Sequence, residues 1–331
     1  MHETEKSIMR NFSTLFIIGN GFDISHELQT SYAKFKEYLA KKYGEFEGHF
    51  IPSIGMLPRG EEVADLKDVA QVLLGAFETT DSEEWNNFED LLAKIDFGYF
   101  HDAVEIPLDA EGFPTPHARY VMEDESNALL IAFTQVEELL AKWLEDTVIR
   151  TKKALAPIYN FQELAPSNTG YLSFNYTDTL EEIYDIQNVL HIHGRLTHSE
   201  RLIFGSQKEG VSEQTGWHQW DNKISSIHQI LQKDVTVQLE LHRNFFDKIG
   251  SQTTRVLSGG FSMGSADTEY LERICRDLPG TAEWYVSEFE YTENGGKPFK
   301  YKCAKLREAG FLGPVGYFEP KSGQLHIDSS N

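Results

Sequence analysis

A glycine-rich segment interrupts an apolar run near residue 19. Residues 13–19 (STLFIIG) are almost continuously apolar and lead into Gly19-Asn20-Gly21-Phe22-Asp23, with His26 shortly after. A glycine turn between a buried strand and a helix lets backbone N–H groups approach a phosphate, whose negative charge the helix N-terminus favours. The segment therefore predicts nucleotide binding, although a tight turn alone would also explain the glycines. Asp23 is expected either to cap the next helix or to contact the ligand.

Two histidines stand two residues apart in Val189-Leu-His-Ile-His193, so the side chains of His191 and His193 are expected on one face of a strand. Imidazole titrates near neutral pH, which suits a general base. Gly194, directly after His193, leaves room for a substrate. Two other interpretations stay open: the histidines are buried and hydrogen-bonded, or they bind a metal ion. Because no spacing identifies the further ligands that a metal site needs, no metal is predicted.

Polar residues also follow two other strand-like segments. Asn175 ends the segment 170–175, and its amide offers a donor and an acceptor for a ribose hydroxyl or an attacking water. Asparagine tolerates turn geometry as well, so a structural role is the alternative. Thr177 and Asp178 fit either the first turn of a following helix or contact with a ligand. Gly260-Phe-Ser262 follows the apolar segment 255–259 in the same manner.

These four segments must be positioned by the strands that precede them. Parallel strands end at one edge of an open sheet, where ligands of α/β folds bind. The alternation of strand-like and helical patterns predicts an α/β fold with a Rossmann-like, mostly parallel sheet formed by residues 12–58 and 167–325. Helical spacing rich in acidic residues predicts a helical insertion over 59–166. Further strands are expected at 202–204 and 284–289, and helix over 224–249.

Charge and composition exclude several functions. The chain of 331 residues carries 52 acidic and 30 basic residues, a formal net charge of −22. Such a field repels phosphate backbones, so direct nucleic-acid binding is not expected. No apolar run reaches the roughly 20 residues that span a bilayer, and the polar segment MHETEKSIMR does not predict a signal peptide. Two cysteines supply no disulfide framework. A cytoplasmic protein without membrane association is therefore expected.

Two further patterns narrow the chemistry. A Gly-x-Gly-x-x-Gly fingerprint would need glycine where Ile24 stands, so a hydride-transferring dehydrogenase is disfavoured. Trp85, Phe88 and Leu92 recur at helical spacing, which predicts a core stripe. Glu89, beside that stripe, is expected to be an ordinary exposed acid, with a lid group that reaches the site as the alternative.

The order of these motifs resembles that of the bacteriophage abortive-infection AbiH family from about residue 13 to 290. The resemblance is carried by Gly19-Asn-Gly-Phe-Asp23, His26, Trp85-x-x-Phe-Glu89, Phe174-Asn-Tyr-Thr177, His191-Ile-His-Gly194 and Phe204-Gly205. The sequence departs from the family at Gly259-Gly-Phe-Ser-Met263, where Gly-His-Ser is usual, and at Glu27-Leu-Gln29. The resemblance implies a role in antiphage defence.

That family is in turn similar to the sirtuin-type NAD-binding fold. Thr177 stands where the sirtuin pattern has aspartate, and the four-cysteine zinc module of the deacylases is missing, so the resemblance implies NAD cleavage to ADP-ribose and nicotinamide instead of deacylation. NAD is thus the expected substrate. The resemblance implies catalytic roles for His193 and Asn175. It implies contacts with NAD by Gly19, Asn20, Gly21, Phe22, Asp23, His26, Thr177, Asp178, His191, Gly194, Gly260, Ser262 and Asp267.

Two alternatives to an NAD hydrolase follow from the same residues. The first is a module that senses NAD or a related nucleotide without cutting it. The second is an interaction protein whose helical insertion recognises a phage component or a partner protein of a defence system. Amphipathic helices in the insertion would also allow an oligomer. Fold similarity by itself does not decide between these alternatives.

Overall fold

The computed structural model of the chain describes residues 11–46, 48, 50–78, 88–149, 155–198, 200–207 and 214–328. The chain forms two compact units. The first, which we call the sheet unit, consists of the described parts of Met1–Gln29, Thr151–Arg201 and Asp234–Asn331. The second, the helical unit, consists of those of Thr30–Arg150 and Leu202–Lys233.

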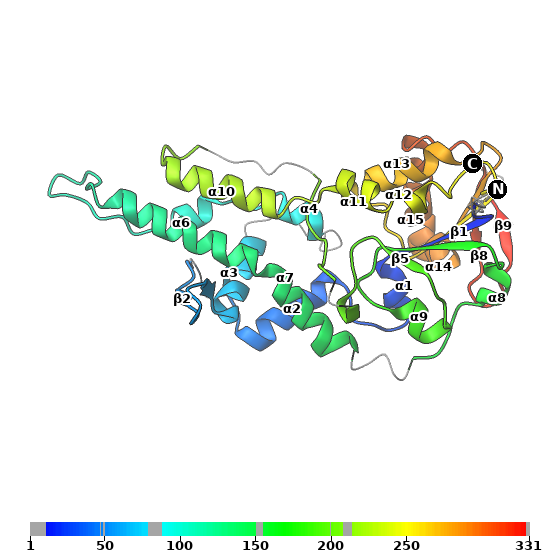
Figure 1. Cartoon of the computed structure of the whole chain (residues 1–331), viewed down its shortest axis with the longest axis horizontal. Coiled ribbons are helices and arrows are strands. Elements are labelled where there is room, and N and C mark those ends of the chain that lie inside the picture. Colours follow the sequence, from blue (N-terminus) through cyan, green and yellow to red (C-terminus); the bar gives the residue numbers. More distant parts are fainter. Residues whose placement is uncertain are drawn as a thin grey trace, which may run out of the picture. The chain divides into compact units, whose positions relative to one another are not determined.

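The sheet unit is built on seven strands in the order β5-β4-β1-β6-β7-β8-β9 (Figure 1). All neighbouring pairs are parallel except β8 and β9. If the strands of this sheet are renumbered from 1 in the order in which they follow along the chain, the first six lie side by side in the order 3-2-1-4-5-6. The numbers fall as far as β1 and rise after it. The strands are β1 (Thr14–Ile18), β4 (Thr169–Ser173), β5 (Val189–His191), β6 (Arg255–Gly259), β7 (Glu283–Ser287), β8 (Val315–Phe318) and β9 (Leu325–Ile327).

The central strand β1 is buried along its whole length, which explains its continuous apolar sequence. Its side chains alternate between two cores: Leu15 and Ile17 join one cluster, Phe16 and Ile18 the other. Helices contribute to both clusters, so both faces of the sheet are covered. These helices are α1 (Asn20–Ser25), α8 (Phe161–Leu164) and α9 (Thr179–Tyr184) on one face, with α11 (Val235–Leu241), α12 (Arg243–Phe246), α13 (Thr268–Asp277) and α15 (Lys297–Glu308) on the other.

Short elements complete the sheet unit: the 3₁₀ turns η3 (Leu196–His198), η4 (Ser265–Asp267) and η5 (Glu293–Gly296), and α14 (Glu288–Thr292). Helix α14 begins with a capping box, in which the Ser287 side chain and the Glu290 side chain satisfy each other's backbone N–H groups. Within the parts of the chain that the structure describes, no helix has the length and apolar character that crossing a membrane requires.

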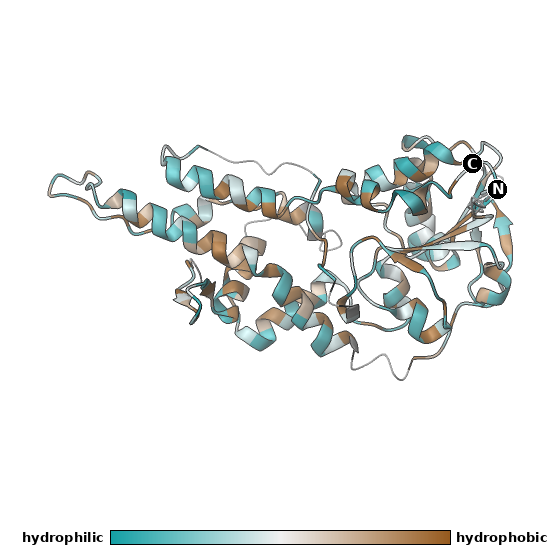
Figure 2. Ribbon diagram, in the orientation of Figure 1, coloured by the Kyte–Doolittle hydropathy of each residue, from teal (hydrophilic) through white to brown (hydrophobic). Residues whose placement is uncertain are grey.

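The helical unit packs its helices along amphipathic faces, with α6 against α10 and α3 against α2, α6 and α7. Hydrophobic and hydrophilic stretches alternate along these helices (Figure 2), as expected where one side of each helix is buried. Its elements are α2 (Tyr32–Tyr43), α3 (Leu66–Glu78), α4 (Phe88–Leu92), α5 (Gly98–His101), α6 (Ala118–Thr134), α7 (Val136–Leu144), the π-helix η1 (Glu145–Ile149), α10 (His218–Ile230) and the antiparallel pair β2 (Ile54–Met56) and β3 (Glu62–Ala64).

Glu89 is a buried member of a charge pair in this unit. The residue is 8% exposed, and its carboxylate lies 2.8 Å from Nζ of Lys233, whose side chain is fully buried. The expectation of an exposed acid at this position is wrong, because Lys233 arrives from a distant segment and neutralises the carboxylate. Trp85, expected in the same core stripe, lies outside the described residues.

The mixed α/β class and the mostly parallel sheet are confirmed by the structure, while some details differ. Residues 202–204 form no strand, because the Leu202 N–H donates to the Glu137 carboxylate instead of a neighbouring strand. The helical pattern over 224–249 divides into α10, α11 and α12. Residues 30–58 and 202–233, which the sequence analysis grouped with the sheet, belong to the helical unit.

Candidate functional site

The four segments singled out in the sequence follow four adjacent parallel strands. In register, the ends of β5, β4, β1 and β6 form one row across the sheet, made of His191, Ser173, Ile18 and Gly259. Hydrogen bonds continue beyond this row, from the Phe174 N–H to the Ile18 carbonyl at 2.9 Å and from the Ile192 N–H to the Ser173 carbonyl at 3.0 Å. The loops after the four strands therefore meet at one edge, which we call the carboxyl edge.

The glycine turn after β1 packs directly against the loop after β6. The N–H groups of Gly19 and Gly21 donate to the carbonyls of Gly259 and Gly260, at 3.2 and 2.9 Å, and the Phe22 N–H donates back to Gly19. A Cβ atom at Gly21 would lie 2.7 Å from the Gly260 Cα. Gly260 has φ +66°, and a Cβ there would lie 2.0 Å from the Phe22 nitrogen. Close approach of two backbones thus accounts for these glycines, and the three N–H groups already have partners within the protein.

Asp23 connects the β1 and β4 segments. It lies in the first turn of α1, is 1% exposed, and accepts hydrogen bonds from the hydroxyls of Thr177 and Thr179, both at 2.6 Å. The two hydroxyls lie 3.0 Å apart. Two hydroxyl donors offset part of the cost of burying a carboxylate. Asp23 and Thr177, predicted as ligand contacts, therefore hold two loops of the carboxyl edge together.

Replacing Asp23 by asparagine is expected to lower the free energy of unfolding by about 2 kcal/mol, because hydrogen bonds to a charged acceptor contribute more than those to a neutral amide. Urea unfolding of the purified chain measures the change. Asp185→Asn is the matched control, since Asp185 is an exposed acid in the same unit and asparagine tolerates its left-handed backbone. Equal losses in the two variants would contradict the role given to Asp23.

His26 is a packed residue with both ring nitrogens in use. Its Nδ1–H donates to the Phe22 carbonyl at 2.7 Å, and Nε2 accepts from the Tyr184 hydroxyl at 2.6 Å. That hydroxyl in turn accepts the N–H groups of Ile158 and Tyr159. The imidazole also stacks on the Tyr159 ring. These contacts give His26 a structural role, and they leave neither nitrogen directed at a ligand.

Burial lowers the pKa of His26 below its ordinary value, with the Asp23 charge opposing the shift. On acidification the unfolded chain takes up a proton near pH 6.5, whereas folded His26 stays neutral to lower pH. The contribution of neutral His26 to the free energy of unfolding is therefore fully present above about pH 7. It decreases as the pH falls, by at most about 1.4 kcal/mol per pH unit. Unfolding free energies at pH 7.5 and 5.5 test this: His26→Gln should lose less stability between the two values than the wild type. An identical loss would contradict it.

Asn175 also connects neighbouring segments. It is 5% exposed, and its Nδ2 donates to the Gly19 carbonyl at 3.0 Å. Its backbone N–H donates to the Ser173 hydroxyl at 3.1 Å, and its carbonyl accepts from Nδ1 of His191 at 3.0 Å. The side chain thus contacts the glycine turn, and the expected contact with a ribose hydroxyl or a water stays a prediction.

His193 is a buried residue of the carboxyl edge. Strand β5 ends at His191, so His193 stands in the following turn, and the expectation that both imidazoles share one strand face is wrong. The Nδ1–H of His193 donates to the Phe174 carbonyl at 3.1 Å. Its Nε2 is buried, has no hydrogen-bond partner among the described residues, and lies 3.5 Å from Oδ1 of Asp267. The rings of Phe174, Tyr176 and Tyr270 surround the imidazole.

The other predicted residues divide between the interior and the surface. Phe22 is a core residue, Gly194 is buried against the Arg201 carbonyl, Asn20 is half-buried and Ser262 is exposed. His191 and Asp178 form a separate cluster with Glu181, which the sequence analysis did not single out. The spacing of Asp178 and Glu181, three residues apart at a helix start, would have placed them on one face.

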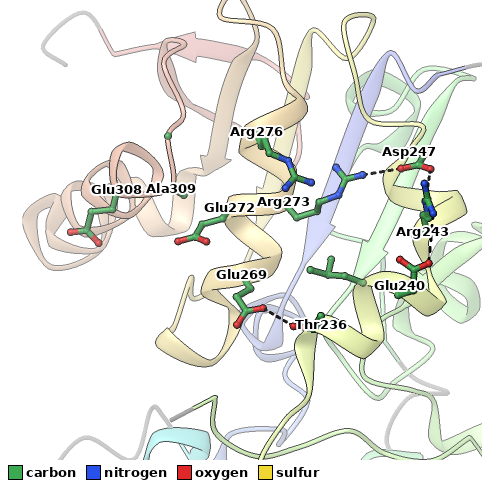
Figure 3. A pocket seen from close by; sticks show the side chains of 12 residues that line it. Thr236, Glu240, Arg243, Asp247, Glu269, Glu272, Arg273, Arg276, Glu308 and Ala309 are labelled. Carbon is green, nitrogen blue, oxygen red and sulfur yellow. Dashed lines mark hydrogen bonds and ion pairs between the residues drawn. The ribbon is translucent and has the colours of Figure 1, made fainter.

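A cavity of about 880 Å³ lies elsewhere on the sheet unit, lined by α11, α12, α13 and the end of α15 (Figure 3). None of the predicted site residues lines it. Its arginines face carboxylates: Arg273 lies 3.0 Å from Asp247, and Arg243 lies 3.4 Å from the same residue. The positive charges are thus balanced inside the cavity wall, and the carboxyl edge remains the better candidate site.

Comparison with known proteins adds one finding. A family model described as "Bacteriophage abortive infection AbiH" matches residues 15–288, a range that contains every residue of the carboxyl edge named above. Neither the curated proteins nor the solved structures contained a match to the chain.

Proposed function

The chain belongs to the bacteriophage abortive infection AbiH family, and from that premise we propose that it acts in defence by hydrolysing NAD to ADP-ribose and nicotinamide during infection. The family accounts for the defence role. The chemistry is inferred from the carboxyl edge of the sheet, where His193 carries the argument.

The strand order supports a nucleotide at this edge. The order 3-2-1-4-5-6 is that of doubly wound, Rossmann-like sheets, in which a dinucleotide binds where the order reverses. In this chain that position lies between β1 and β6, at the contact of the glycine turn with Gly260. Because the N–H groups of Gly19, Gly21 and Phe22 are used inside the protein, we assign dinucleotide contacts to the side chains of Asn20 and Ser262 at the same loops.

The observation that carries the proposal is the buried Nε2 of His193, which has no hydrogen-bond partner within the described part of the chain. Donation from Nδ1 to the Phe174 carbonyl fixes the tautomer that leaves a lone pair on Nε2. A lone pair held in this way can accept a proton from water. The Asp267 carboxylate, 3.5 Å from Nε2, would stabilise the imidazolium that results.

In the proposed reaction the bond between the nicotinamide nitrogen and ribose C1′ breaks, and its electron pair neutralises the nicotinamide ring. A water oxygen bonds to C1′ and releases its proton to His193 Nε2, which gives ADP-ribose, nicotinamide and one proton overall. Asn175, anchored to the Gly19 carbonyl, would orient the ribose or the water. Preorganised groups of this kind act mainly by positioning the reactants.

The burial of His193 suggests a closed resting state. The residue is 4% exposed, and three aromatic rings surround it. NAD would reach Nε2 only after these side chains move, so we propose that infection triggers this opening. A protein that depletes NAD must be inactive in healthy cells, and a closed site would meet that requirement.

The same burial favours a second candidate function, a nucleotide sensor that binds NAD without cleaving it.

Cells that carry the chain provide the first test. NAD is quantified before and after infection with a panel of phages, beside cells that lack the chain. The proposed function expects NAD to fall and nicotinamide to rise only in infected cells with the chain. Protection without any change in NAD would favour the sensor.

A further inference from the structure

A second group of polar residues lies beside the proposed NAD site, and its geometry is that of a metal centre. Asp178, Glu181 and His191 each offer one ligand atom, and these atoms all lie within 4.8 Å of one another. Ligand bonds of about 2.0–2.2 Å place the ligand atoms of one ion at most about 4.4 Å apart. The three side chains therefore need to move little to share an ion.

The orientation of His191 matches that of a metal ligand. Its Nδ1–H donates to the Asn175 carbonyl at 3.0 Å, since a carbonyl can only accept. In the neutral imidazole, Nε2 then carries the lone pair, yet it lies 2.8 Å from the Glu181 Oε1, which is also an acceptor. Either a proton on Nε2 or a metal ion bound between the two atoms would make this contact favourable. Metal-bound histidines commonly donate their other N–H to a backbone carbonyl in this way.

Two carboxylate oxygens of the cluster are buried without a partner. Asp178 is 5% exposed, and its Oδ1 has no hydrogen-bond donor among the described residues, while Oδ2 accepts from Thr197. The Glu181 Oε2 is also buried and has no donor within the described part of the chain. An unpaired buried carboxylate oxygen is costly, so such atoms call for a ligand.

The surrounding charges leave the cluster negative. Among the described residues, Arg195 places its guanidinium 3.7 Å from Glu181, but the guanidinium lies closer to Glu200, at 3.1 Å. Because this one positive charge is shared between Glu181 and Glu200, it does not balance the charges of both Asp178 and Glu181. A divalent cation would.

We propose that Asp178, Glu181 and His191 bind one divalent transition-metal ion of the Zn²⁺ or Mn²⁺ type. One imidazole with two carboxylates suits these ions better than Mg²⁺ or Ca²⁺, which prefer oxygen ligands alone. No metal was predicted from the sequence, because no spacing identified further ligands for the pair His191 and His193. The cluster contains His191 but not His193, and Asp178 and Glu181 supply the other two ligand atoms. The ion would join the start of α9 to the end of β5. The proposal goes beyond the proposed NAD chemistry, which does not require a metal ion.

The test uses the purified full-length chain dialysed against EDTA and then given Zn²⁺, Mn²⁺ or Mg²⁺. Metal per chain is measured after gel filtration, and the midpoint of thermal unfolding is measured at about 100-fold excess of metal over its dissociation constant. We expect one Zn²⁺ or Mn²⁺ per chain, a rise in the midpoint of about 5 °C, and no comparable effect of Mg²⁺.

Two variants make the test specific. Glu181→Gln should bind the metal more than about 100-fold more weakly, and its midpoint should not respond to Zn²⁺ or Mn²⁺. Glu182→Gln, which removes the neighbouring exposed carboxylate, should behave as the wild type. The proposal is overturned if the wild type retains no metal, or if Glu181→Gln responds to metal as strongly as the wild type does.

Discussion

Gly260→Ala is expected to lower the free energy of unfolding of the sheet unit by about 4 kcal/mol. The left-handed backbone at this position, φ +66°, costs a non-glycine residue about 1–2 kcal/mol. The added methyl group would also lie 2.0 Å from the Phe22 nitrogen, and overpacking of this kind costs about 1–3 kcal/mol. The two nearest atoms, the Phe22 nitrogen and the Gly21 carbonyl carbon, cannot move aside easily because both belong to the backbone.

Equilibrium unfolding in urea provides the measurement, with Gly280→Ala as the matched control. Gly280 has open space around its Cα and no left-handed backbone, so alanine there should change stability by less than about 1 kcal/mol. Since Gly260 packs on the glycine turn, the variant should also weaken NAD binding. A Gly260→Ala protein as stable as the Gly280→Ala control would show that the two loops do not pack as described.

His193→Asn is expected to reduce NAD cleavage by about 10³-fold, because a positioned general base contributes about 10²–10⁴-fold to the rate. Asparagine can keep a donor toward the Phe174 carbonyl but supplies no basic nitrogen at the position of Nε2. Infected cells with the variant should retain their NAD and lose protection against phage.

The control for this variant is His117→Asn, which replaces an exposed histidine of the helical unit. It should deplete NAD as the wild type does. Thermal unfolding of both variants establishes that they fold. If the folded His193→Asn variant depleted NAD as fast as the wild type, His193 would not be the general base. The defence role of the family would not be affected by that result.

The parallel sheet was predictable because its signal is local. The run before Gly19 is apolar almost along its whole length, as expected for a strand buried on both faces, and the runs before Asn175 and Gly260 are short, mostly apolar and followed by turn residues. The meeting of the four loops then follows from parallel pairing alone. Strands β8 and β9, of four and three residues, are short and were not foreseen.

The roles of individual residues were harder to predict, because they depend on partners far away in the sequence. Glycine at 19 and 21 is compatible with a phosphate-binding turn, but in the fold these residues contact a backbone some 240 positions later. Asp23 similarly finds its donors at Thr177 and Thr179. A motif identifies residue types, whereas the partner that each residue meets is a tertiary property.

Charged residues show the same limit. From the sequence, Glu89 is predicted to be an exposed acid, whereas in the structure its carboxylate pairs with the buried Lys233. Lys302 on α15 is also buried, and its ammonium group donates to the Phe261 carbonyl and the Glu290 carboxylate, which fixes the loop after β6. Single-sequence patterns assign such residues to solvent because isolated charges are rarely buried.

The catalytic role of His193 is tested by chromatographic measurement of NAD, ADP-ribose and nicotinamide after the purified 331-residue chain is incubated with NAD and a lysate of phage-infected cells. We predict that NAD disappears while ADP-ribose and nicotinamide form in equal amounts with the wild type, and that His193→Asn leaves NAD intact. Intact NAD with the wild type in lysates of phages against which the chain protects, or equal product formation by both proteins, would contradict the claim that His193 cleaves NAD.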